Sequence, residues 1–317
     1  MFRRTEFLRA AAVSVIALAL TQGASAADKP YRLGFMIWSS STPFSSALIK
    51  SARDEAKAEG VALDIQGGNA DLPTQIAVIQ QFIAQKVDAI LVNASDPKGI
   101  VPAIRQANAA GIPVLAVNQG VDTSTGAQIV TYVGVDDFTF GQQQGELVAK
   151  AIGGKGSVAY IMGVLGTTPQ LQRKAGLEDT LKKYPDVKIV DSRSASWDNA
   201  KALAITQDYL SKYPQGMLAA VLDQGPEGVN GAAFAAKQGR ADVKILLGDY
   251  PSDVNKAIAE GTVYGTVNQD PVLQGVAGVK DAVLWLDGKK DMVPAPNHYM
   301  ELPIVTKDNV EKYPASW

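Results

Sequence analysis

The stretch DAILVNASDPKGIVPAIRQANAAGIPVLAVN, residues 88–118, shows how this chain is built. It begins with the apolar run 88–93, continues through 99–110 with apolar residues at helical spacing, and returns to an apolar run at 113–118. Short apolar runs joined by an amphipathic helix are typical of parallel strands that are buried on both faces. The stretch therefore predicts one strand–helix–strand unit of an α/β fold.

The same alternation extends over most of the chain. Apolar runs predict strands at 31–37, 61–67, 158–163, 187–192, 218–224 and 243–249, and helical spacing predicts helices at 44–60, 72–86, 169–183, 197–212 and 226–239. This number of strand–helix units is larger than one sheet of ordinary size contains. We therefore expect an α/β protein with two doubly wound parallel-sheet lobes, with a first crossing near 134–136, just after the polar stretch 119–131.

Composition removes several classes of function. The 317 residues are 46% hydrophobic and 20% charged, as in a folded soluble protein, and the formal net charge of −2 argues against a nucleic-acid role. The sequence has no cysteine, which excludes disulfides, cysteine-bound metals and a thiol nucleophile. A histidine-based metal site or catalytic triad would rest on His298 alone. We expect no cofactor and no metal.

The N-terminal residues have the pattern of an export signal. The basic segment 1–9 precedes an apolar run at 10–20 and an A-x-A site at Ala24 and Ala26. The apolar run is too short to remain as a membrane anchor. We expect cleavage near Ala26, with the ordinary secretory route favoured over the twin-arginine route. Since no cysteine can carry a lipid, the product is expected to be free in the periplasm.

The loops that follow the strands carry the candidate binding groups. In open parallel sheets, ligands bind beyond the carboxyl ends of the strands. Amides supply both donors and acceptors, as a hydroxyl-rich ligand requires, and an aromatic face fits the apolar face of a sugar or polyol. The candidate ligand-binding residues are Trp38, Thr42, Phe44, Asn118, Gln119, Arg173, Trp197, Asp223, Asp249 and Gln269.

Six segments occur in an order that resembles a known family. They are IWSSSTPF (37–44), VDAILVNASDP (87–97), AGIPVLAVNQG (110–120), QRKAG (172–176), LLGDYPSD (246–253) and GTVNQDP (265–271). Together they resemble the ribose/galactose-type periplasmic sugar-binding proteins of ABC importers, a type I periplasmic binding protein family. The resemblance covers about Tyr31 to Lys312.

The resemblance implies two lobes joined by a three-segment hinge that close around one sugar. The N-terminal lobe would comprise 28–134 plus 270–297, with a helix at 271–286, and the C-terminal lobe 135–269 plus 298–317. It also implies roles for individual residues. Phe44 and Trp197 would pack on the sugar, Arg173 and Gln269 would hydrogen-bond to it, and Asp249 lies at or next to a sugar-binding carboxylate.

Three positions depart from the family pattern. Thr42 stands where the family often has Asn, the pair Asn118-Gln119 where it often has Asp-Arg, and Gly225 where it often has Asn. Hydrogen bonds assisted by charge are about twice as strong as neutral ones. The loss of the charged pair is therefore expected to change the preferred ligand, in favour of a smaller or acyclic polyol or an unusual sugar.

The expected function is a periplasmic solute-binding protein, not an enzyme, that delivers a neutral sugar or polyol to an inner-membrane ABC permease. The alternative is a sensor input that presents the bound sugar to a chemoreceptor or sensor kinase. A monomer is the default for such a shuttle. An exported hydrolase would need two facing carboxylates, and Asp223 and Asp249 are the pair available. Simpler interpretations also stay open: Trp38 and Trp197 as core residues, and Asp249 as a helix cap.

Overall fold

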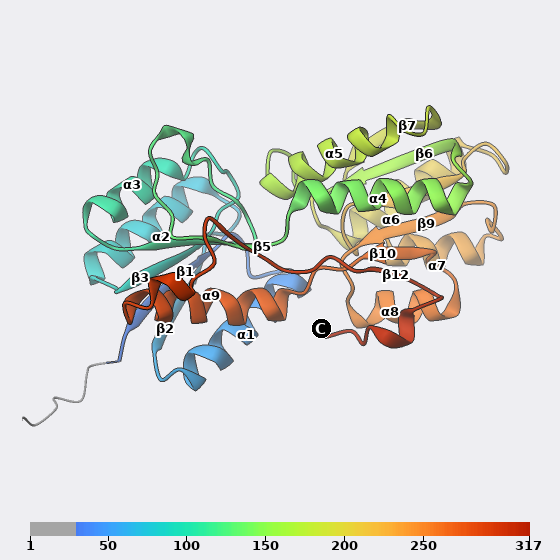
Figure 1. The fold of residues 1–317 in the computed structure, drawn as a ribbon. Helices are drawn as coiled ribbons and strands as arrows, with labels where there is room; N and C mark the ends of the chain where they lie inside the picture. Colours follow the sequence, from blue (N-terminus) through green and yellow to red (C-terminus); the bar gives the residue numbers. More distant parts are fainter. Residues whose placement is uncertain (1–29) are drawn as a thin grey trace, which may run out of the picture. The chain divides into compact units, whose positions relative to one another are not determined.

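The computed structural model describes residues 30–317, so the expected export signal and its cleavage near Ala26 lie outside the described residues. The described chain contains two six-stranded sheets with helices packed on them (Figure 1). All strand pairs are parallel except one, and strands alternate with helices along the chain. This confirms the predicted fold class of two parallel-sheet α/β lobes.

The first sheet has the order β11-β5-β4-β3-β1-β2. Its strands are β1 (Arg32–Ile37), β2 (Ala62–Gly67), β3 (Ala89–Asn93), β4 (Val114–Val117), β5 (Tyr132–Gly134) and β11 (Asn297–Tyr299), and its helices are α1 (Pro43–Ala58), α2 (Leu72–Gln85), α3 (Val101–Ala109) and α9 (Pro271–Leu286). Side chains alternate across the sheet. Met36 packs with α2 and α3, whereas Phe35 and Ile37 pack with α1 and α9. Both faces are therefore buried, as the apolar runs require.

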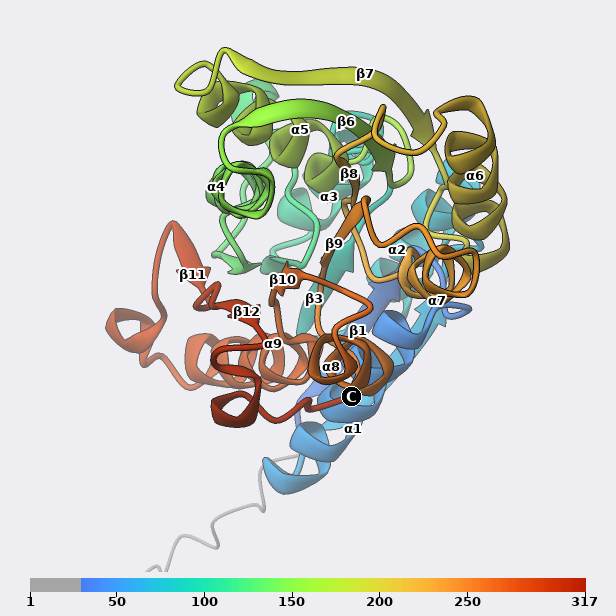
Figure 2. The same ribbon diagram turned by 90° about the vertical axis from the view of Figure 1, so that its right-hand side faces the viewer.

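The second sheet has the order β12-β10-β9-β8-β6-β7, and only the β10–β12 pair is antiparallel. Its strands are β6 (Lys155–Met162), β7 (Asp186–Ser194), β8 (Ala220–Asp223), β9 (Lys244–Gly248), β10 (Gly265–Val267) and β12 (Ile304–Thr306), and its helices are α4 (Asp137–Ile152), α5 (Thr168–Leu181), α6 (Asn199–Lys212), α7 (Val229–Lys237) and α8 (Ser252–Glu260). Figure 2 shows α4 and α5 on one face of this sheet and α6 and α7 on the other. Short 3₁₀ helices occur at η1 (Thr123–Thr125), η2 (Lys290–Met292) and η3 (Val310–Lys312).

The helices α4 and α5 meet backbone to backbone. A Cβ added at Gly141 would lie 2.0 Å from the carbonyl oxygen of Arg173, and one at Gly176 would lie 2.0 Å from the carbonyl oxygen of Phe138. Only glycine permits so close an approach. The approach brings Arg173, in the second turn of α5, next to Asp137 at the start of α4. The packing of two helices thus positions a charged pair.

The C-terminal part of the chain returns to both sheets. β11 pairs with β5, so His298 and Tyr299 belong to the first sheet, whereas the expected division gave them to the second lobe. His298 is partly buried, and its Nδ1 lies 2.7 Å from Oδ2 of Asp281 on α9. The chain leaves the first sheet only after Tyr299 and joins the second at β12. The third boundary between the lobes therefore lies after Tyr299, two residues later than expected.

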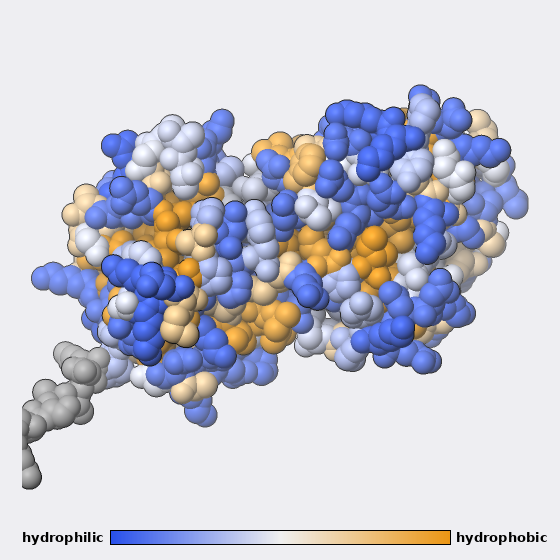
Figure 3. Space-filling model, viewed as in Figure 1, coloured by the Kyte–Doolittle hydropathy of each residue, from blue (hydrophilic) through white to orange (hydrophobic). Residues whose placement is uncertain are grey.

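Hydrophilic residues cover much of the face shown in Figure 3. An apolar area stands out near the start of α5, where Leu165 is 61% exposed and Leu171 is 49% exposed. Among residues 30–317, no helix is both long enough and apolar enough to span a membrane.

Candidate ligand-binding site

A cavity of about 440 Å³ is lined by loops that follow strands of both sheets. Nine of the ten candidate residues contribute to its wall: Trp38, Thr42, Phe44, Asn118, Gln119, Arg173, Trp197, Asp249 and Gln269. They come from the ends of β1, β4, β7, β9 and β10 and from the starts of α1 and α5. The rule that ligands bind beyond the carboxyl ends of parallel strands therefore selected neighbouring side chains.

Asp223 is the exception, because it does not reach the cavity wall. It is the last residue of β8 and is 1% exposed. Its Oδ1 accepts a hydrogen bond from the backbone N–H of Gly225 at 3.2 Å, so the carboxyl group turns back onto its own loop. Asp223 is therefore a buried neighbour of the site, and its expected place among the lining residues is corrected.

The loop after β1 forms part of the first-lobe wall. Thr42 caps α1: its Oγ1 accepts from the backbone N–H of Ser45 at 3.1 Å and donates to the Ser45 hydroxyl at 2.9 Å. Phe44 follows in the first turn and meets the ring of Trp317 edge to face, with ring centroids 5.5 Å apart. Capping thus fixes the loop that carries Phe44 to the cavity.

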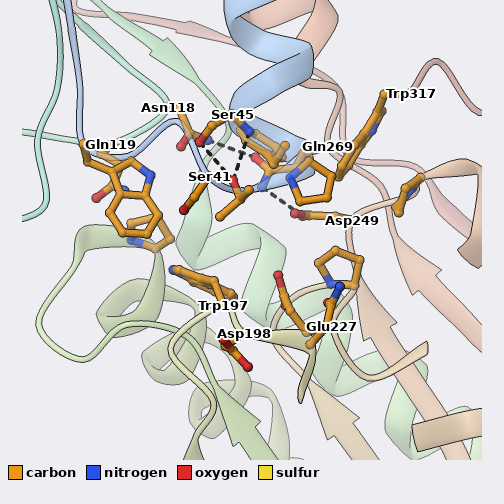
Figure 4. Close-up of a pocket in the computed structure, with 18 of the residues that line it drawn as sticks. Ser41, Ser45, Asn118, Gln119, Trp197, Asp198, Glu227, Asp249, Gln269 and Trp317 are labelled. Carbon is orange, nitrogen blue, oxygen red and sulfur yellow. Dashed lines mark hydrogen bonds between the residues drawn. The ribbon is translucent and has the colours of Figure 1, made fainter. Parts of the chain in front are cut away.

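A chain of hydrogen bonds joins the two sheets beside the cavity. Asn118, after β4, donates from Nδ2 to Oε1 of Gln269 at 3.5 Å. Gln269, after β10, donates from Nε2 to Oδ1 of Asp249 at 2.8 Å, and it accepts from Gln274 at 3.1 Å. Figure 4 shows Asn118, Gln269 and Asp249 in sequence across the cavity wall. The hinge amide is therefore held by groups of both lobes.

Arg173 is almost entirely buried, with 2% of its surface exposed. Its Nε donates to Oδ1 of Asp137 at 2.9 Å and its Nη1 donates to the carbonyl oxygen of Gln224 at 2.8 Å. Nη1 also lies 3.6 Å from Oδ1 of Asp249, and the guanidinium carbon lies 3.8 Å from the ring centroid of Phe140. Only Nη2 has no hydrogen bond to the described residues. Nη2 is therefore the guanidinium nitrogen that can still donate a hydrogen bond to a ligand.

Trp197 follows the end of β7, and its indole ring lies over Gly163 and Gly225. A Cβ at Gly163 would lie 1.8 Å from Cζ2 of the indole, and one at Gly225 would lie 2.9 Å from Cζ3. Both glycines therefore provide room for the ring. The guanidinium carbon of Arg173 lies 5.9 Å from the indole centroid, within the range of a cation–π contact. The second lobe thus presents one aromatic face and one cation to the same cavity.

Backbone strain gathers at this site. Asn118, Trp197 and Asp249 have φ values of 62°, 58° and 60°, in the left-handed region. This region is uncommon for residues other than glycine and is a true outlier for a bulky side chain. Such conformations persist only where the surrounding structure enforces them, and they concentrate at functional sites. Three such residues around one cavity support the assignment of the site.

Burial changes the charge state of the carboxyl groups. Desolvation raises the pKa of Asp249 to about 6, although the charge of Arg173 works against it. Desolvation also raises the pKa of Asp223 to about 8 and that of Glu227 well above its usual range, and neighbouring carboxylates add to both shifts. The second lobe therefore holds carboxyl groups, at the cavity and next to it, that ionise less readily than ordinary acids.

Glu227 and Trp317 are among the lining residues that the sequence reasoning missed. Glu227 lies two residues after Gly225, in a strand-end loop of which only Asp223 was retained. Trp317 reaches the cavity from the far end of the chain, held by hydrogen bonds of 2.7 Å from the backbone N–H and the hydroxyl of Ser252 to its carbonyl oxygen. Examination of the whole loop would have found Glu227, whereas no local pattern marks Trp317.

The site is equipped for recognition. Amide, hydroxyl and carboxyl groups alternate with the faces of Trp38, Phe44 and Trp197, which together suit a compact polyhydroxyl compound. In the part of the chain that the structure describes, no group of three or more His, Asp or Glu residues could hold a metal ion.

Two α/β lobes with such a cavity at their strand ends define a class of solute-binding proteins. The chain belongs to the periplasmic binding protein family, whose domain model matches residues 33–290. Within it, the relatives bind sugars or polyols for ABC transporters, and they are binding proteins, not enzymes. The family implies a periplasmic location.

Three known proteins show the extent of the similarity. The chain is 30% identical to the xylitol-binding protein of Mycolicibacterium smegmatis over 81% of its own length and 72% of that protein. It is 28% identical to the galactofuranose-binding protein YtfQ of Escherichia coli, over 84% of its own length and 85% of that protein. The structure of a periplasmic solute-binding protein from Actinobacillus succinogenes with bound D-allose matches with a TM-score of 0.82 and 26% identity, over 90% of this chain and 100% of that one.

Proposed function

We propose that this protein captures one neutral sugar or polyol in the cavity between its two lobes and delivers it to an inner-membrane ABC permease. The N-terminal segment would direct export and would then be removed near Ala26. The observation that carries the proposal is the cavity itself, in which amide and hydroxyl groups of the first lobe oppose Trp197 and Glu227 of the second (Figure 4), and which Arg173 also lines. The ligand would thus contact both lobes at once.

Such contacts couple binding to lobe closure. A ligand that touches both lobes favours the closed arrangement, because only that arrangement completes both sets of contacts. Gln269 stands at the pivot, since it connects Asn118 of the first lobe with Asp249 of the second. Phe44 and Trp197 would hold the apolar faces of the ligand from the two sides, and the Nη2 of Arg173 would donate to one of its oxygens.

The amides at positions 118 and 119 define the proposed ligand class. Asn118 is already engaged with Gln269, whereas Oε1 of Gln119 is buried and has no hydrogen bond to the described residues. A buried acceptor without a partner costs about 1–3 kcal/mol, and a ligand hydroxyl would remove that cost. Pentitols, cyclitols and uncommon aldoses fit this neutral wall, and xylitol, galactofuranose and D-allose appear in the names of the similar proteins.

A thermal-shift screen of the purified protein tests the proposal. The panel comprises xylitol, ribitol, D-arabinitol, D-ribose, D-galactose, D-allose and myo-inositol, with L-leucine and L-glutamate as compounds of other classes. A ligand at 100 times its Kd adds about 2.7 kcal/mol of stability, which gives a clear rise in Tm. We expect a rise with one stereochemical group of polyols or sugars. A flat response to all the neutral compounds would refute the proposed ligand class.

A further inference from the structure

Glu227 is an ionisable residue on the wall of the cavity. It lies between β8 and α7, is 8% exposed and lines the cavity. Its Oε2 is buried and has no hydrogen-bond partner among the described residues. Figure 4 shows Glu227 on the side of the cavity that carries Trp197 and Asp198, facing the side that carries Asn118. A buried polar atom without a partner is explained if a bound ligand supplies its hydrogen bond.

Gly225 makes room for this carboxyl group. A Cβ at position 225 would lie 2.2 Å from Oε2 of Glu227, and it would also lie 2.9 Å from the indole of Trp197. Gly225 does not have a left-handed backbone, so the absence of a side chain matters here for space. Any larger residue would displace the carboxyl group. The loop is therefore built so that Glu227 supplies the polar group at this point of the wall.

The charge of Glu227 is not balanced by its surroundings. Arg173 is the cation on this wall, and its Nε and Nη1 are already committed to Asp137 and Gln224. Asp249 adds negative charge nearby, and burial raises the pKa of the Glu227 carboxyl well above its usual range. A neutral carboxyl group both donates and accepts one hydrogen bond, which is what a hydroxyl group offers in return. The carboxylate of an acid sugar would instead meet the negative charge of Asp249 and would lose its hydration.

We propose that Glu227 is a specificity-determining contact, which pairs with a hydroxyl group of the ligand and excludes acid sugars of the same carbon skeleton. The proposal rests on the proposed function and narrows its substrate class. Aldoses, alditols and cyclitols would be accepted, whereas the corresponding aldonates and uronates would be rejected. The second lobe thus selects against charge while the amides of the first lobe contact the rest of the ligand.

The test compares neutral and acidic compounds by isothermal titration calorimetry at pH 7. The probes are xylitol with D-xylonate, D-galactose with D-galacturonate, and the neutral compound that gives the largest thermal shift with its own aldonate. The variants are Glu227→Gln, Glu227→Ala and the control Glu260→Gln, which makes the same change at an exposed position on α8, outside the cavity.

We expect the wild type to prefer the neutral member by at least about 100-fold, because the acid would bury an unpaired charge close to Asp249. Glu227→Gln keeps the shape, the neutral charge and both hydrogen-bonding roles, so it should hold both the neutral affinity and the preference within about fivefold. Glu227→Ala should weaken neutral binding about tenfold or more, since it leaves the hydroxyl group unpaired. Glu260→Gln should change neither quantity.

The outcomes separate the two proposals. Neutral compounds that bind the wild type and Glu227→Ala with equal affinity would overturn the role of Glu227 and leave the proposed function intact. Tight binding of an acid sugar by the wild type would do the same. Failure of all neutral probes to bind the wild type would refute the proposed function, and the inference with it. Circular dichroism of each variant shows whether the fold is retained. If Glu227→Ala misfolds, a loss of neutral affinity above about tenfold in the isosteric Glu227→Gln would overturn the role of a neutral carboxyl group at this position.

Discussion

Replacement of Arg173 by methionine tests the charged pair that supports the cavity. Methionine keeps an unbranched apolar stem, but it removes the guanidinium group that contacts the ring of Phe140 and donates to Asp137 and Gln224. Asp137 would then remain buried without its counter-charge, since both side chains are almost fully inaccessible. Removal of one partner from a buried pair costs about 3–5 kcal/mol. We expect Arg173→Met to lower the free energy of unfolding by that amount at pH 7.

The loss should depend on pH in a defined direction. Burial already raises the pKa of Asp137 above its ordinary value, and Arg173 opposes that rise. Without the arginine the pKa rises further, so the folded state retains a proton that the unfolded state releases. Stability of the variant then falls relative to wild type as pH increases above the ordinary aspartate pKa of about 4. The difference should be larger at pH 8 than at pH 5.

Urea unfolding followed by far-ultraviolet circular dichroism measures both effects. The double variant Asp137→Asn with Arg173→Met should recover at least about 2 kcal/mol, because it removes the stranded charge. The control Arg193→Met breaks the exposed 2.9 Å pair with Asp208 and should cost less than about 1 kcal/mol. A loss below about 1 kcal/mol for Arg173→Met, or a double variant no more stable than the single one, would refute this reasoning.

Two further predictions concern neighbouring residues. Gly163→Ala would place a Cβ 1.8 Å from the indole of Trp197, so the ring must move; we expect at least about tenfold weaker ligand binding by calorimetry, and unchanged affinity would contradict the stacking role. The pKa of Asp223 is raised to about 8 in the folded state. Its contribution to the free energy of unfolding is therefore largest below pH 4 and declines as pH rises to 8. The decline is at most about 1.4 kcal/mol per pH unit. Asp223→Asn should flatten this decline in urea titrations between pH 5 and 8.5, and an unaltered slope would show that another group causes it.

The sequence predicted long elements better than short ones. The expected helices at 44–60 and 72–86 correspond to α1 and α2 within two residues at each end, because their apolar spacing is regular and their ends carry capping residues. β5, β10, β11 and β12 have three residues each, too few to show alternation. The helix α4 also escaped prediction, since the face that it buries includes Gly141, Gln144 and Gly145. Its packing depends on small and amide side chains that do not form an apolar stripe.

The candidate site was predictable where position along a strand determines position in space. Asn118, Trp197 and Asp249 each follow a strand, and parallel strands bring their carboxyl ends together. Asp223 shows the limit, because its location at a strand end does not determine which way its carboxyl group turns. Trp317 shows a second limit of the sequence reasoning, because its position at the cavity depends on long-range contacts with Phe44 and Ser252. Tertiary packing decided both cases.

Calorimetric titration of the ligand identified by thermal shift tests the central claim most directly. The protein should bind one molecule per chain with a Kd in the micromolar range, about −8 kcal/mol, as a compact polyol held by hydrogen bonds and two aromatic faces would give. Trp197→Ala should weaken binding at least about tenfold, whereas Trp285→Ala, on α9 outside the cavity, should leave it unchanged. Equal affinity in the wild type and Trp197→Ala would contradict the placement of the ligand between the lobes.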